Sequence, residues 1–224
     1  EGNPEPVELL GSRLPKDAGP EALHRELASL ASGAHPLVAA IPEPMNEVVT
    51  QHLSAFRSLM PVDMDLAGAS IGNLILTSGY LSLDRQLEPV VRVFSGMVQA
   101  RGVVMPVADS CAHLCVRLEN GEVIVGQHRF TGKTATAITS PIHDMWLSAS
   151  LDDPSPVSVP IQPRLAHVIR TADLICYPVG SFFSSVMANL LPLGVSCAVR
   201  EAACQDSVKA VLDVELNEGQ MLED

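Results

Sequence analysis

The chain has 224 residues, of which 47% are hydrophobic and 18% charged, so it can form a large core and is not an intrinsically disordered chain. Its formal net charge is −12 and no three basic residues adjoin, which disfavours binding to nucleic acid or to an anionic membrane surface. An anionic ligand would therefore have to be held by local backbone donors or by a metal ion.

The first part of the chain is predicted to be mainly helical. Residues 1–19 are rich in proline and glycine and are predicted to form a loop. A helix begins at Pro20, where the missing N–H costs no hydrogen bond, and ends near Gly33. A second amphipathic helix is expected over residues 43–60, with His52 on its apolar face as a core or boundary histidine.

The middle of the chain changes from helical to β patterning. Residues 68–83 are apolar on nearly all sides, which predicts a buried segment, and Asp84 is expected to cap the helix that follows. Residues 103–107 are predicted to form a buried strand. Residues 112–130 give the clearest β signal, because two alternating runs flank an Asn-Gly pair at 120–121 and predict an antiparallel hairpin.

The remaining part combines a long connection with an α/β unit. Residues 131–163 are predicted to be a connecting loop around a short element at 145–147. A short helix near 165–169 precedes a buried strand at 173–177, a glycine turn and a helix over 181–191. The order strand, glycine turn, helix is typical of open α/β sheets.

The strongest candidate site is the turn at Gly180, which delivers Ser181, Ser184 and Ser185 to the start of a helix. Exposed N–H groups at a helix N-terminus, supported by the helix dipole, bind anions, and serine hydroxyls would add donors. Two interpretations stay open at this point. The turn is either a phosphate site, or a simple chain reversal in which Ser181 only caps the helix.

A second candidate lies at Ser70, Gly72 and Asn73, inside the apolar segment 68–83. Gly72 permits close approach of another backbone or of a ligand. Asn73 is predicted to be buried and therefore to be hydrogen-bonded to the backbone or to a ligand. The alternative, favoured from the residues alone, is that Ser70 and Asn73 only satisfy the start of a helix.

Histidine and cysteine residues near the hairpin form a third candidate. Asp109, Cys111, His113 and Cys115 share one face if this segment is an extended strand, but neighbouring side chains on that face lie roughly 7 Å apart, too wide for one tetrahedral zinc site. We expect no zinc there, with Cys111 and Cys115 facing the core. His128 and Lys133 could reach a phosphate, although solvated loop residues are the favoured interpretation.

The cysteines also indicate a reducing compartment, because their number is odd and no two form a CxxC pair. Cys115, Cys176 and Cys197 lie in apolar runs and are predicted to be buried, reduced thiols. The sequence shows no signal peptide and no apolar run of ~18 residues, so we expect a soluble, cytoplasmic protein without disulfides.

Three segments resemble one known family in order and spacing. They are GASIGNLIL at 68–76, ARGVVMPV at 100–107 with the hairpin ENGEVIVGQH, and ADLICYPVGSFFSSVMANLLPLGV at 172–195. They are similar to blocks of the 2-phospho-L-lactate transferase (CofD-like) family, which includes the YvcK-type gluconeogenesis factors. The resemblance implies a single α/β domain over 1–224 with a Rossmann-like, largely parallel sheet flanked by helices and an antiparallel hairpin insertion.

The resemblance implies a transferase that acts on a phosphorylated, nucleotide-linked small molecule with magnesium. The alternative that it also implies is a non-catalytic, nucleotide-sugar-binding regulator. In either case the protein is expected to be a homo-oligomer that binds neither nucleic acid nor membrane. The residues expected to contact the ligand are Ser70, Gly72, Asn73, His113, Gly180, Ser181, Ser184 and Asn189.

The sequence also departs from the family pattern. The first glycine of the family's Gly-Pro-Gly-Ser turn is Pro178 here. The family's glycine-rich opening turn and its Asp-Asp-Gly segment, which resemble its nucleotide and magnesium determinants, do not precede Glu1, so magnesium ligands are expected outside this segment. Residues 206–216 look helical where the family continues with a strand, which suggests that an internal segment after residue 204 is missing.

Overall fold

The computed structural model describes residues 3–130, 138, 140–177, 180–202 and 210–211. The chain forms two compact units, Glu1–Pro106 and Val107–Asp224, which we call the helical unit and the mixed unit. Each unit is described by itself. Over the described residues, no helix combines the length and the apolar character needed to cross a membrane.

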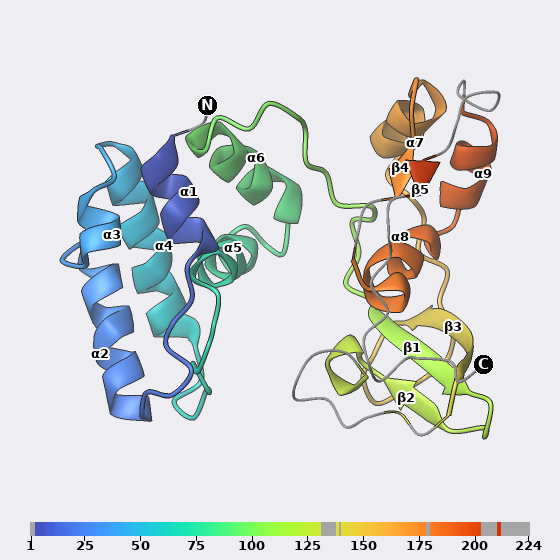
Figure 1. Ribbon diagram of the computed structural model, residues 1–224, viewed down its shortest axis with the longest axis horizontal. Helices are drawn as coiled ribbons and strands as arrows, with labels where there is room; N and C mark the ends of the chain where they lie inside the picture. The colour runs from blue at the N-terminus through green and yellow to red at the C-terminus, as the bar shows by residue number, and fades with distance from the viewer. Residues whose placement is uncertain (1–2, 131–137, 139, 178–179, 203–209, 212–224) are drawn as a thin grey trace. The chain divides into compact units, whose positions relative to one another are not determined.

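The described part of the helical unit consists of helices around one apolar core (Figure 1). Leu27 of α2, Leu53 of α4 and Ile75 of α5 are fully buried in it, because apolar residues recur at helical spacing on one face of each helix. The helices are α1 (Pro4–Gly11), α2 (Pro20–Ala31), α3 (Pro36–Ala39), α4 (Met45–Leu59), α5 (Ile71–Ser82) and α6 (Leu87–Met97).

The prediction of a loop over 1–19 was wrong for α1. Pro4 and Pro6 lie in its first turn, where a missing N–H costs no intrahelical bond. Leu9 is fully buried in the core of the unit, and Asn3 Nδ2 donates to the Met97 carbonyl at 3.0 Å. Tertiary contacts thus hold a helix that is too short to form in isolation.

The predicted helices at 20–33 and 43–60 are confirmed as α2 and α4, and the segment 68–83 contains α5. The prediction that Asp84 caps the next helix was wrong. Asp84 has φ +52° and lies in the turn between α5 and α6, so the chain reaches the N-cap position only at Gln86. The Gln86 side chain makes no capping bond.

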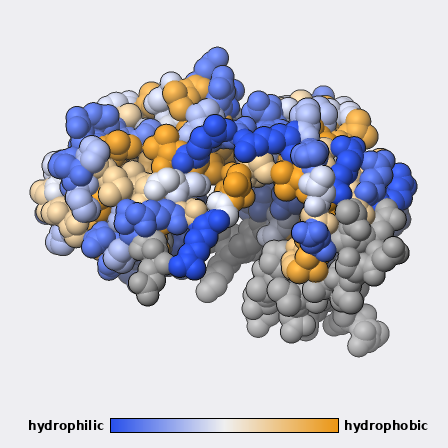
Figure 2. All heavy atoms as spheres, turned by 90° about the horizontal axis from the view of Figure 1, so that it is seen from above, coloured by the Kyte–Doolittle hydropathy of each residue, from blue (hydrophilic) through white to orange (hydrophobic). Residues whose placement is uncertain are grey.

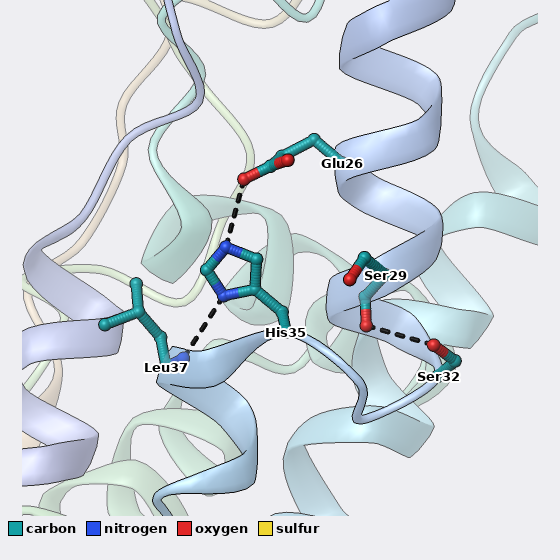
Figure 3. Close-up of polar contacts among 5 residues, drawn as sticks. All are labelled: Glu26, Ser29, Ser32, His35 and Leu37. Atoms are coloured by element: carbon teal, nitrogen blue, oxygen red, sulfur yellow. Dashed lines mark hydrogen bonds and ion pairs between the residues drawn. The ribbon is translucent and has the colours of Figure 1, made fainter.

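A histidine that the sequence did not single out begins α3 (Figure 3). His35 Nδ1 accepts the Leu37 N–H at 3.2 Å, and its Nε2 lies 3.0 Å from Glu26 Oε1 on α2. Because Nδ1 accepts, the ring proton is on Nε2 and is donated to the carboxylate. His35 therefore ties the start of α3 to α2.

His52 is half-buried on α4, with its ring 5.4 Å from that of Phe94 on α6 in an edge-on arrangement, so it occupies the boundary position that the prediction of a core or boundary histidine allowed. Burial lowers the pKa of His52 below its ordinary value of 6.5. At a pH between the lowered pKa of the folded chain and 6.5, His52 of the unfolded chain binds a proton that His52 of the folded chain does not.

We expect the helical unit to lose stability as the pH falls below about 6.5. The contribution of neutral His52 to the free energy of unfolding is complete above that pH and decreases toward the lowered folded pKa. Melting temperatures of wild type and His52→Gln between pH 5 and 7.5 measure the effect. The variant should show a shallower dependence on pH, and two equal slopes would contradict the assignment.

The mixed unit begins with a three-stranded antiparallel sheet of order β2-β1-β3 (Figure 1). β1 (His113–Leu118) and β2 (Val123–Val125) form the predicted hairpin, and Gly121 has φ +88° in its turn. β3 (Ile142–Ser148) pairs with β1 along its whole length. The short element predicted at 145–147 within the connection 131–163 is part of β3, which extends over seven residues because it pairs with β1.

The other elements of this unit include a single parallel strand pair among the described residues. They are η1 (Gln127–Arg129), α7 (Pro163–Arg170), β4 (Cys176–Tyr177), η2 (Phe182–Met187), α8 (Ala188–Leu190), α9 (Val195–Arg200) and β5 (Ala210–Val211). β4 pairs with β5, so the helix predicted over 206–216 was wrong at β5, and the rest of 206–216 lies outside the described residues. The buried strand predicted at 173–177 is reduced to two residues, of which Cys176 is exposed.

The buried strand predicted at 103–107 is absent. These residues form neither helix nor strand, and Val103 and Val104 are 72% and 61% exposed. Apolar residues are interspersed among hydrophilic ones on the face shown in Figure 2. The fold thus combines helices with a small antiparallel sheet, while the Rossmann-like parallel sheet stays a prediction.

Candidate functional site

The helix after Gly180 begins as a π-helix, η2, and continues directly into α8. The N–H groups of Ser185 and Val186 both donate to the Ser181 carbonyl, at 2.9 and 3.2 Å. The helix predicted over 181–191 is confirmed, but its first turn is wider than an α-helical turn. Such turns are rare and are frequently found at functional sites.

Ser181 occupies the N-cap position of this helix, but its side chain makes no capping bond. Its Oγ is buried and finds no hydrogen-bond partner in the part of the chain that the structure describes. A buried hydroxyl without a partner costs about 1–3 kcal/mol, so such groups call for an explanation. Of the two interpretations left open by the sequence, the structure does not support simple capping.

The other predicted residues of this turn are distributed around it. Gly180 has room for a Cβ, whose nearest neighbours would be Ser185 Cβ at 3.6 Å and Oγ at 3.7 Å. The fold itself therefore does not require glycine at this position. Ser184 is half-buried, whereas Asn189 is exposed and donates from Nδ2 to the Ser185 carbonyl at 2.7 Å.

The sheet fixes the far end of the same helix. Ala188 and Leu191 pack against the buried face of the hairpin, where Leu114 and Val116 of β1 lie. His113, one residue before Leu114, is half-buried and lines a depression of about 540 Å³ at the start of β1. The helix that follows Gly180 therefore packs on β1, the strand that His113 begins, within the same unit.

The candidate residues of the helical unit lie at the start of α5. Ser70 is the N-cap, and its Oγ accepts the Asn73 N–H at 3.4 Å, which confirms the capping interpretation there. Asn73 is exposed, so the prediction that it is buried was wrong. The side chain points away from the core because residues 71, 72, 74 and 75 occupy the buried face.

Gly72 is buried and serves packing between two helices. A Cβ at this position would lie 2.5 Å from the carbonyl oxygen of Leu10 on α1. The close backbone approach that glycine permits is therefore made by Leu10. Ser70, Gly72 and Asn73 belong to one unit and the Gly180 turn to the other, so their predicted common cleft stays a prediction.

The cysteines differ from expectation in three places, one of which is Cys197, predicted to be buried but only half-buried. Cys115 is fully buried and is a free thiol, as are Cys111, Cys176 and Cys197. Cys111 and Cys176 are exposed, so the prediction that they are buried was wrong. Cys111 precedes the first strand residue, and Cys176 lies on a strand of only two residues, so neither belongs to a sheet face that a core covers. Cys204 and Lys133 lie outside the described residues.

Gly126 and Gln127 carry no sequence pattern that predicted a site, and for His128 a solvated loop was favoured over contact with a phosphate. All three line the depression that also contains His113. The sequence signal that could have found them is a glycine directly after a predicted strand. In the structure Gly126 has φ +94°, a backbone conformation that favours glycine, and the 3₁₀ turn η1 follows it.

A family model described as "2-phospho-L-lactate transferase CofD" matches residues 23–213. Among curated proteins, the gluconeogenesis factor of Bacillus subtilis is 32% identical over 127 residues, which cover 57% of this chain and 36% of that protein. The gluconeogenesis factor of Listeria monocytogenes is 26% identical over 147 residues, which cover 66% and 42%. The chain thus spans about two fifths of the length of these relatives.

Solved structures with a similar fold include protein BH3568 from Bacillus halodurans. The similarity has a TM-score of 0.50 at 22% identity and covers 90% of this chain and 64% of that chain. A second structure of BH3568, described as a member of the UPF0052 family, gives a TM-score of 0.50 at 23% identity with the same coverage. These similarities concern the fold.

Proposed function

The chain belongs to the family described as 2-phospho-L-lactate transferase CofD, and from that premise we propose that it acts on a phosphorylated, nucleotide-linked small molecule. In this proposal the turn at Gly180 and Ser181 contacts a phosphate of the ligand. The reaction would be transfer of the phosphorylated group from the nucleotide to an acceptor.

The observation that carries the proposal is the hydroxyl of Ser181, which is buried and has no partner among the described residues. A phosphate oxygen would accept its hydrogen bond, and the N–H groups of the first helical turn would add further donors. Gly180 supports the same assignment, because the fold leaves room for a larger residue there. A ligand close to the backbone would explain the glycine.

Magnesium enters the proposal only through the family. Over the described residues, no three His, Cys, Asp or Glu side chains come together in a group that could hold a metal ion. The described residues therefore do not fit a magnesium site.

A second candidate function is favoured by the curated relatives, which are named gluconeogenesis factors. In this alternative the chain binds a nucleotide sugar at the same turn and regulates partners without catalysis. Both functions use the same phosphate contacts, so the turn does not separate them.

We expect the intact protein to bind uridine or guanosine diphosphate compounds saturably, as measured by calorimetric titration. Incubation with a nucleotide-activated phospholactate donor, a deazaflavin acceptor and Mg²⁺ should yield the phospholactyl product, detected by mass spectrometry. Saturable binding without product would favour the regulator, and no binding of any nucleotide-linked compound would contradict both functions. Omission of the acceptor is the control for simple hydrolysis of the donor.

A further inference from the structure

A depression in the mixed unit lies apart from the residues of the Gly180 turn. It has a volume of about 540 Å³, within the range of small-molecule sites. His113 and Leu114 at the start of β1 form one side of it, and the segment that follows β2 forms another. The residues that line it include His113, Leu114, Gly126, Gln127, His128 and Leu151.

The shape of the depression depends on Gly126. Its φ of +94° is in the region that favours glycine. A Cβ at this position would lie 2.8 Å from Cε1 of the His128 ring and 2.9 Å from Cδ2 of Leu151. The backbone of Gly126 is therefore in close contact with both side chains. The Arg129 N–H donates to the Gly126 carbonyl at 3.0 Å and fixes the turn that carries His128.

The chemistry of the lining contrasts with that of the whole chain. The chain has a formal net charge of −12, yet no carboxylate is among the described residues that line this depression. Two histidines are among its lining residues, and an imidazole ring carries an N–H donor. N–H donors without a neighbouring carboxylate suit a negatively charged group.

We propose that this depression binds a small oxyanion, a carboxylate or a phosphate group, between His113 and His128. His113 begins β1 and His128 follows the end of β2. Because the two strands are antiparallel, these two positions lie at the same, open end of the hairpin. The site shares no residue with the Gly180 turn, and His113, which the family resemblance assigns to the ligand, is assigned here to a separate oxyanion.

Nuclear magnetic resonance of the histidine rings in the full chain tests the proposal. Inorganic phosphate and succinate are the two probes, added separately at constant ionic strength. The rings of His113 and His128 should shift with a single, shared saturation curve for at least one probe. His113→Ala and His128→Ala should each weaken that binding on the order of tenfold, as expected for loss of one hydrogen bond to a charged group.

His167→Ala is the matched control, because His167 is exposed on α7 in the same unit and does not line the depression. It should leave the affinity unchanged. Ser181→Ala should also leave it unchanged, which separates this site from the turn. The proposal is overturned if neither probe gives a saturable shift, or if the His167 ring shifts as much as the two pocket rings.

Discussion

Gly72→Ala is expected to destabilise the helical unit by about 3 kcal/mol, the upper part of the range for overpacking. The added Cβ would lie 2.5 Å from the Leu10 carbonyl oxygen and 3.3 Å from its carbonyl carbon. Both are backbone atoms of α1, so no side-chain rotation can relieve the contact. Either α1 or the start of α5 must move, and each of these movements disrupts the apolar core between them.

Gly96→Ala is the matched control, because Gly96 lies in α6 and a Cβ there would have no neighbour within 4 Å. Alanine is a better helix former than glycine by about 0.5–1 kcal/mol, so this variant should be neutral or slightly more stable. Chemical denaturation followed by far-ultraviolet circular dichroism measures both. Equal stability of the two variants would show that α1 and α5 are not in contact at Gly72.

Ser181→Ala is expected to weaken binding of a nucleotide-linked ligand roughly tenfold to a hundredfold, which corresponds to loss of a hydrogen bond to a charged group. The unliganded protein should melt at the same temperature or higher, because the change removes a buried hydroxyl that has no partner among the described residues. Calorimetric titration and thermal melts of the same samples give both quantities. A capping role would produce the opposite pattern, with unchanged affinity and a loss of about 1 kcal/mol of stability.

Ser196→Ala is the control for Ser181→Ala, since Ser196 is exposed on α9 in the same unit. It should change neither affinity nor melting temperature. Gly180→Val is a companion variant that should abolish binding by blocking approach of the ligand to the backbone. A Gly180→Val protein that folds and still binds would place the ligand elsewhere.

Local patterns in the sequence were sufficient for the elements whose apolar spacing reflects one buried face. Helices α2, α4 and α6 and the β1–β2 hairpin are of this kind. Of β3 the sequence indicated only a short element at 145–147, because the rest of its strand character comes from pairing with β1. Nor could it show that 103–107 lacks a strand, because an apolar run does not reveal whether a partner strand is present.

The candidate site illustrates the same limit. Ser70 and Ser181 are both serines at the N-cap of a helix, and the sequence allows either of them to cap the helix or to contact a ligand. Only the folded structure distinguishes them, because the Ser70 hydroxyl accepts a backbone N–H of α5 and the Ser181 hydroxyl accepts none from its helix. Similarly, the composition around Gly72 indicates close approach, but whether the neighbour is Leu10 or a ligand depends on the packing of α1.

The π-helical turn at η2 has a consequence for comparison with relatives. A π turn contains about one residue more than an α turn, and one residue rotates an α-helix by about 100°. Ala188 and Leu191 fix one end of this helix on the sheet. Residues before the π turn are therefore rotated about the helix axis relative to their positions in an uninterrupted α-helix. Relatives that lack this extra residue would have a one-residue gap in an alignment here and would direct a different side chain to the position of Ser181.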